Sequence, residues 1–172
     1  MINRSIKYII QFIFFVLLQV LILNNIQYSG FINPFLYILF ILWLPFDIPK
    51  PLLLVVGFVL GFVIDLFGST LGMHTSACVF LAFCRPFVLQ LIAPRDGYDL
   101  NQQPGIADFG FRWFLIYASS LTLLHHLFLF FVEVFRFSDF FYTLGRAFSS
   151  SVFTILLIII CQLFRYNSSR TT

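Results

Sequence analysis

Long apolar runs, separated by short polar or proline-rich stretches, make up most of this chain. A transmembrane helix needs about 20 such residues, and each run approaches or reaches that length. The runs do not alternate as barrel strands would, and helices satisfy their own backbone hydrogen bonds in hydrocarbon. We therefore predict an all-α integral membrane protein, a single transmembrane domain over residues 1–172. Its bundle of about six transmembrane helices is expected at 7–23, 33–46, 52–67, 71–92, 112–134 and 143–164.

The second and third predicted spans are short, and a proline-rich turn joins them. Residues 45–51 contain three prolines. Proline ends one helix because it lacks an amide proton, yet it suits the first turn of the next. These two spans are expected either to borrow flanking residues or to form a short hairpin in a locally thinned membrane.

Charge is scarce and unevenly distributed along the chain. Only 10% of residues are charged and 60% are hydrophobic, whereas soluble domains have about 25% charged residues. If the N-terminus is inside, most Lys and Arg residues fall on the inner side, so both termini are predicted to be cytoplasmic. The net charge of +3 then reflects orientation, and no nucleic-acid partner is expected. The inner set is Arg4, Lys7, Lys50, Arg95, Arg112, Arg165 and Arg170, against Arg136 and Arg146 outside.

Three residues of the third predicted span share one helix face. Gly57, Gly61 and Asp65 are spaced by four residues. A pair of glycines at this spacing lets another helix approach closely. A carboxylate within a span is expected to face the bundle interior or its outer rim with a partner. This face therefore predicts close packing or partner binding, unless Asp65 merely ends its helix near the outer surface.

The fourth predicted span carries a charged residue well inside it. Arg85 precedes Pro86, which is expected to kink the helix. Asp65 lies too near the outer end to pair with Arg85, so Asp47 in the inner turn is the expected partner.

Polar residues form stripes on the last two predicted spans. Ser119, Thr122, His126 and Glu133 line one face of the fifth, and Tyr142, Arg146, Ser150 and Thr154 line one face of the sixth. The two stripes are expected to face each other through hydrogen bonds. A proton relay through His126 and Glu133 is the alternative.

Motifs for catalysis or for metal and cofactor binding are missing. The chain has no nucleophile elbow, zinc-protease helix, phosphate loop or dinucleotide fingerprint. Its three cysteines, Cys78, Cys84 and Cys161, fit no metal site and are expected to be packing residues. No enzymatic activity and no cofactor are expected.

The paired short helices, the turn at 45–51 and the following Gly-x3-Gly-x3-Asp with Gly68 and Gly72 resemble the bacterial rod shape-determining MreD family. The length and the basic start, Met1-Ile-Asn-Arg4, also fit. The resemblance is most specific over 44–86. The high phenylalanine content (26 residues) and the long polar loop after the fourth span depart from the family pattern. That family shares the architecture of the substrate-binding subunits of energy-coupling-factor transporters.

The resemblance implies a non-enzymatic scaffold of the cell-wall elongation machinery in the bacterial inner membrane. It implies direct binding of an MreC-like bitopic protein and indirect links to a RodA-type glycosyltransferase, a class B penicillin-binding transpeptidase and MreB filaments. Membrane lipid is the other expected contact. Gly57, Gly61, Asp65 and Gly72 would form a contact face, with Asp47 and Lys50 as hairpin contacts.

Two other classes of protein stay open. A small-molecule-binding transporter subunit would need an outer polar pocket, which Asp65, Glu133, Arg136 and Arg146 could line. An intramembrane enzyme would use His126 and Glu133.

Overall fold

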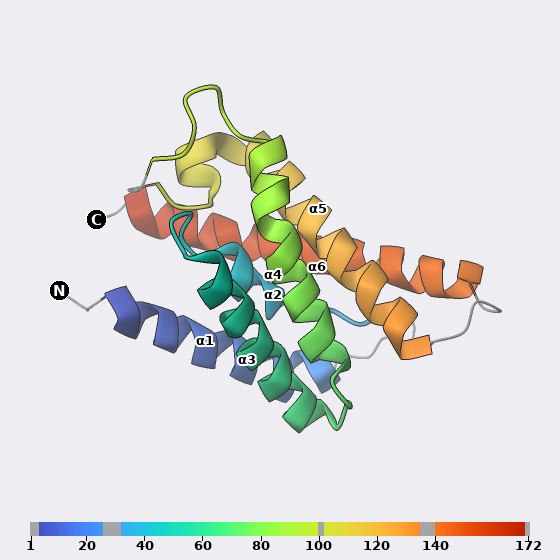
Figure 1. Cartoon of the computed structure of the whole chain (residues 1–172). Helices are drawn as coiled ribbons and strands as arrows, with labels where there is room; N and C mark the ends of the chain where they lie inside the picture. Colours follow the sequence, from blue (N-terminus) through green and yellow to red (C-terminus); the bar gives the residue numbers. More distant parts are fainter. Residues whose placement is uncertain (1–3, 26–31, 100–101, 135–139, 171–172) are drawn as a thin grey trace.

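The computed structural model describes residues 4–25, 32–99, 102–134 and 140–170. These residues form helices and no sheet (Figure 1). The long helices are α1 (Arg4–Leu21), α3 (Lys50–Gly68), α4 (Met73–Leu91), α5 (Ile106–Val134) and α6 (Phe140–Arg170). Two short elements lie between α1 and α3: the 3-10 turn η1 (Leu23–Asn25) and α2 (Ile38–Leu42).

The five long helices are each long and apolar enough to cross a membrane. The chain is thus a multi-pass helical membrane protein, as predicted. The predicted spans at 7–23, 52–67, 71–92, 112–134 and 143–164 correspond to these helices. The helices α5 and α6 extend furthest beyond their predicted bounds, at the start of α5 and at both ends of α6. Near the start of α5, Gly110 has φ 80° and ψ 167°. This left-handed conformation, which glycine adopts without strain, separates the first turn of α5 from the rest of the helix.

The predicted helical span at 33–46 is wrong. Its only helix, α2, has five residues, which span about 8 Å at 1.5 Å per residue. The segment is nevertheless deeply buried, with Tyr37 and most of α2 fully inaccessible. Apolar character here reflects burial among other helices rather than a membrane-spanning helix.

The buried segment carries the chain back across the bundle. It leaves the end of the bundle where α3 and α4 are joined, here called the hairpin end, with Asn33 beside Ser150. It reaches the opposite end at Lys50, where α3 begins. Because of this return, α1 begins and α6 ends on the same side, here called the termini end (Figure 1). That both termini are cytoplasmic stays a prediction.

Residues 33–46 contain one short helix between irregular stretches, and we call them the broken segment. Side chains of the surrounding helices satisfy its backbone groups. Irregular backbone at membrane depth is tolerated only where protein supplies its hydrogen bonds. The pairs are Asn33 N–Ser150 Oγ (3.0 Å), Phe35 N–Thr154 Oγ1 (3.2 Å), Gln19 Nε2–Pro34 O (2.9 Å) and Tyr117 OH–Leu42 O (3.1 Å). The polar residues of α1, α5 and α6 therefore stabilise the segment that these helices enclose.

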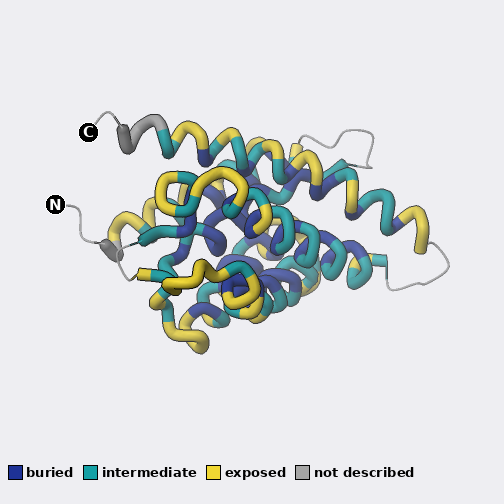
Figure 2. The backbone as a smooth tube through the Cα atoms, turned by 90° about the horizontal axis from the view of Figure 1, so that it is seen from above, coloured by how far each residue is buried: buried dark blue, intermediate teal, exposed yellow. Residues whose placement is uncertain are grey.

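Buried residues gather in the centre of the bundle and exposed residues on its periphery (Figure 2). The exposed positions of the long helices are largely apolar, as at Phe58 on α3 and Phe148 on α6. Such a surface suits contact with lipid. At the termini end Tyr98, which follows α4, stacks on Phe46 at 4.4 Å between ring centroids and donates to Leu89 O at 2.8 Å.

Candidate functional site

The glycine face of α3 packs directly against α4. A Cβ atom at Gly57 would lie 2.9 Å from Cys78 O, and one at Gly61 would lie 2.5 Å from His74 O. Both glycines are buried. The close-packed face predicted from the spacing therefore exists. It is occupied by another helix of the same chain, so its interpretation as a free surface for a partner protein is wrong.

Asp65 on the same face caps the start of α4. Its carboxylate accepts hydrogen bonds from the backbone N–H groups of His74 (3.0 Å) and Thr75 (2.8 Å). The hydroxyls of Thr70 and Thr75 complete its shell. A carboxylate placed there satisfies unpaired amides and complements the positive end of the helix dipole. Asp65 thus holds the α3–α4 hairpin together.

Gly72 has a different role from the other glycines of the motif. It precedes α4 with φ 78°, and nothing lies within 4 Å of the position of its missing Cβ. The requirement at this position is conformational, since few residues other than glycine adopt positive φ without strain. It therefore makes no close packing contact of its own, while it lines the exposed hollow beside α3 and α4, so its predicted part in partner binding stays a prediction.

Arg85 is buried, and its guanidinium binds backbone and phenol oxygens. Its Nε donates to Tyr117 OH at 2.8 Å, and its terminal nitrogens donate to Leu44 O and Pro45 O. These carbonyls follow α2, where the helix dipole also favours a cation. The predicted ion pair with Asp47 is wrong, because Asp47 is exposed and forms no salt bridge with any described residue.

Lys50 is likewise exposed, at the first residue of α3. Together with Asp47 it lies at the termini end, where the predicted hairpin contacts would be accessible to a partner. Nothing in the described contacts tests that prediction.

The polar stripes of α5 and α6 face each other, as predicted. His126 Nε2 lies 3.1 Å from Thr154 Oγ1. Near the hairpin end, the Arg146 Nη2 atom lies 3.2 Å from Glu133 Oε1. Arg136, the other residue expected beside Glu133, is outside the described residues.

All three histidines of the chain meet around the broken segment. The Tyr37 hydroxyl bonds His74 Nδ1 at 2.8 Å and His125 Nε2 at 3.0 Å. The Phe35 ring lies against all three imidazoles, including that of His126 at 5.4 Å between ring centroids. His125 Nδ1 has no hydrogen-bond partner among the described residues.

A polar pocket, here called the hairpin-end pocket, opens next to this cluster at the hairpin end. It has a volume of about 520 Å³ and lies between η1, the start of the broken segment, α3, α4, α5 and α6. Phe35 and His74 line it, and Glu133 and Arg146 supply its charges. Two of the residues predicted for an outer pocket are thus brought together. Asp65 does not line this pocket.

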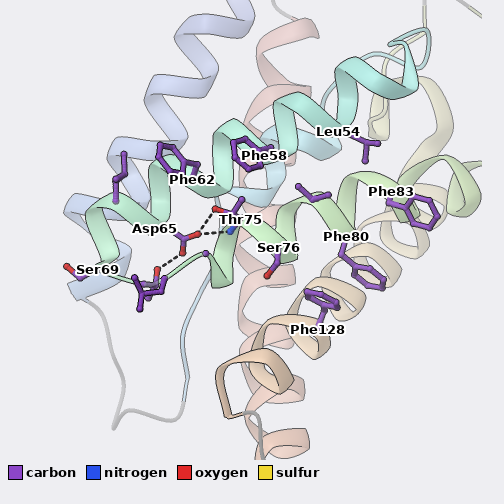
Figure 3. Close-up of a pocket in the computed structure, with 15 residues that line it drawn as sticks. Leu54, Phe58, Phe62, Asp65, Ser69, Thr75, Ser76, Phe80, Phe83 and Phe128 are labelled. Atoms are coloured by element: carbon purple, nitrogen blue, oxygen red, sulfur yellow. Dashed lines mark hydrogen bonds between the residues drawn. The ribbon is translucent and has the colours of Figure 1, made fainter.

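A larger apolar hollow runs along the outside of α3 and α4 (Figure 3). It encloses about 1150 Å³ near the hairpin end and continues into a smaller hollow of about 270 Å³ at Lys50 and Gln90. Leu54 and Phe83 line both parts. We call the combined feature the α3–α4 groove. Its walls are mainly aromatic and aliphatic: Leu54, Phe58, Phe62 and Leu66 of α3, Val79, Phe80 and Phe83 of α4, and Phe128 of α5.

Sequence reasoning missed several buried polar residues that organise the bundle. Gln19 bonds both Pro34 O and Tyr37 N, and Gln162 accepts from Trp43 Nε1 at 2.8 Å. The sequence does indicate that Gln19 and Gln162 are structurally important, because an amide side chain inside an apolar helix requires a hydrogen-bond partner. The identity of those partners was not available, because they lie far away in the sequence.

No group of side chains among the described residues could hold a metal ion. No family model, curated protein or solved structure matches the chain. The candidate functional features are therefore those of the structure itself. They are the α3–α4 groove and the hairpin-end pocket, which both open to the outside of the bundle.

Proposed function

We propose that this protein is a non-enzymatic scaffold of the cell-wall elongation machinery in the bacterial inner membrane. In this role it helps maintain rod cell shape by holding the transmembrane helix of an MreC-like bitopic partner in the α3–α4 groove. The observation that carries the proposal is the length of the groove, which follows α3 over its 19 residues. That length is about 28 Å, close to the roughly 30 Å of a hydrocarbon core.

The chemistry of the groove also suits a helix better than a polar substrate. Phe58 and Phe62 are about half exposed and stack on each other at 5.9 Å between ring centroids. Asp65, the charged residue beside them, has its oxygens bound within the hairpin. In a bilayer, helices associate through close packing rather than through a hydrophobic driving force. A concave aromatic surface supports such packing.

The stretch that carries the resemblance to the MreD family, 44–86, also builds the walls of the groove on α3 and α4. In the proposed assembly both termini are cytoplasmic, with Asp47 and Lys50 on the cytoplasmic side. The RodA-type glycosyltransferase, the class B transpeptidase and MreB filaments are reached indirectly through the partner. The rest of the apolar surface contacts lipid.

Site-specific photocrosslinking tests this proposal. A photoreactive phenylalanine analogue at Phe62 is expected to capture the MreC-like protein in native membranes, as identified by mass spectrometry. The matched control is the same analogue at Phe148, which is equally exposed but lies on α6, outside the groove. Equal capture at both positions, or recovery of the partner without any crosslink at Phe62, would show that the partner does not bind in the groove.

One observation favours a second function, the substrate-binding subunit of a small-molecule transporter. Glu133 and Arg146 do line a pocket at the end where such a subunit would need one. Co-purification of a pair of ATPases with a transmembrane coupling subunit, in place of wall-elongation proteins, would favour this function over the scaffold.

A further inference from the structure

The hairpin-end pocket has the size and the mixed lining of a ligand site. Its volume of about 520 Å³ falls within the roughly 300–1,000 Å³ typical of small-molecule sites. The four helices α3 to α6, the 3-10 turn η1 and the start of the broken segment contribute to it. Phe35, Phe67 and Leu129 provide apolar walls, while Asn24 and His74 provide polar ones.

The charged pair in this pocket has spare hydrogen-bonding capacity. Arg146 donates through both Nη1 and Nη2 to the same atom, Glu133 Oε1, at 3.2 Å. Among the described residues, nothing bonds Glu133 Oε2, and the second N–H of Arg146 Nη1 has no partner. The unpaired Arg146 Nε is buried and out of reach of a ligand, and Asn33, with its amide turned over, accepts from Arg146 Nη2 at 3.0 Å. A guanidinium has five N–H donors and a carboxylate has two acceptor oxygens. Each partner can therefore bind a further group without giving up the ion pair.

The balance of charge indicates which ligand fits. Among the residues that the structure describes, the pocket lining contains one cationic and one anionic side chain. A ligand with a net charge would leave one member of the pair facing a like charge in a poorly solvated place, which is costly. A ligand with an anionic and a cationic group side by side can lie antiparallel to the pair and complement both ends.

We propose that the hairpin-end pocket binds a zwitterionic group, with its phosphate or carboxylate against Arg146 and its ammonium against Glu133. Such a group is found in the phosphoethanolamine headgroup of a membrane lipid and in small soluble zwitterions. The polar walls enclose the charged part, and Phe67 at the rim is 62% exposed and offers apolar surface for lipid chains. This inference does not depend on the scaffold proposal, because the α3–α4 groove has a separate set of aromatic walls.

The test uses the purified full-length protein in mild detergent, with thermal unfolding and native mass spectrometry as readouts. The probes are phosphatidylethanolamine, phosphatidylglycerol with the same acyl chains, and glycerophosphoethanolamine, which has no chains. Phosphatidylethanolamine is expected to raise the unfolding midpoint and to be retained in preference to phosphatidylglycerol. Stabilisation by glycerophosphoethanolamine as well would show that the headgroup alone suffices; stabilisation only by the intact lipid would identify a lipid site. Equal effects of the two phospholipids, or no effect of any probe, would overturn the proposal.

Variants connect the effect to the charged pair. Glu133→Gln with Arg146→Gln is expected to weaken binding of phosphatidylethanolamine by roughly tenfold or more, as charge-assisted hydrogen bonds are lost. The control, Asp96→Asn with Arg112→Gln, removes one charge of each sign from exposed positions at the termini end and is expected to bind normally. If the double variant does not fold, Glu133→Gln alone serves, because its side chain is 38% exposed. It is expected to lose the preference for phosphatidylethanolamine over phosphatidylglycerol, and an unchanged preference would overturn the proposal.

Discussion

Adding one methyl group at Gly61 is expected to force α3 and α4 apart. The new Cβ would lie 2.5 Å from both His74 O and Thr75 Cα, and 2.7 Å from Thr75 N. These are backbone atoms of α4, so no side chain can rotate away. Restoring ordinary van der Waals contact requires about 1 Å of added separation between the helices. The same movement pulls the His74 and Thr75 amides away from the Asp65 carboxylate.

The magnitude follows from these opposing effects. Overpacking costs about 1–3 kcal/mol, and weakening the cap adds about 1 kcal/mol. The better helix propensity of alanine returns about 1 kcal/mol. Gly61→Ala is therefore expected to lower the free energy of unfolding by about 2 kcal/mol, or the midpoint by about 4–8 °C for a chain of this size.

A thiol-reactive fluorescent dye provides the assay, because Cys78 is fully buried and becomes reactive on unfolding. Gly68→Ala is the matched control at the end of the same helix, where the nearest atom to the new Cβ is Thr70 Oγ1 at 3.4 Å. That variant is expected to match the wild type within about 0.5 kcal/mol. Equal midpoints for Gly61→Ala and Gly68→Ala would refute the close approach of α4 to Gly61.

Three further substitutions test the interior with the same assay. Asp65→Ala removes the cap of α4 and is expected to cost about 1–2 kcal/mol, whereas Asp47→Ala at an exposed position is expected to change little; equal losses would contradict the capping role. Arg85→Met leaves the carbonyls of Leu44 and Pro45 without their donor and is expected to lower the free energy of unfolding by about 1–3 kcal/mol or more. Arg85→Lys is expected to recover only part of this loss, because an ammonium lacks the planar fork of a guanidinium. Full recovery would show that charge alone matters. Gln19→Leu keeps the volume but removes both hydrogen bonds to the broken segment, so a loss of about 1–3 kcal/mol is expected and wild-type stability would contradict it.

The sequence predicted the long helices well, because a continuous apolar run has few other stable forms in a membrane. It failed at residues 33–46 for a physical reason. An extended segment enclosed by helices needs the same apolar side chains as a helix that crosses lipid. Asn33 and Phe35 form their bonds with residues 117 and 119 positions away. No local pattern reports such partners.

The candidate site shows a similar division between what local spacing reveals and what it does not. The spacing of Gly57, Gly61 and Asp65 identified a shared helix face. It could not show that α4 of the same chain packs on this face. Arg85 was assigned a carboxylate partner because carboxylates are visible as residue types. Its actual partners include the backbone oxygens of Leu44 and Pro45. Every residue has a carbonyl, so the sequence gives no sign of which ones are available.

The broken segment also constrains the order in which the protein can fold during synthesis. The backbone N–H groups of Asn33 and Phe35 receive their acceptors from Ser150 and Thr154. Those acceptors belong to α6, which is synthesised after the other helices that the structure describes. Until α6 inserts, the segment has polar backbone groups without partners, which hydrocarbon penalises by several kcal/mol each. A bundle that lacks α6 therefore cannot reach the hydrogen bonding of the complete fold, and the buried segment is expected to reach its final place only after α6 has joined the other helices.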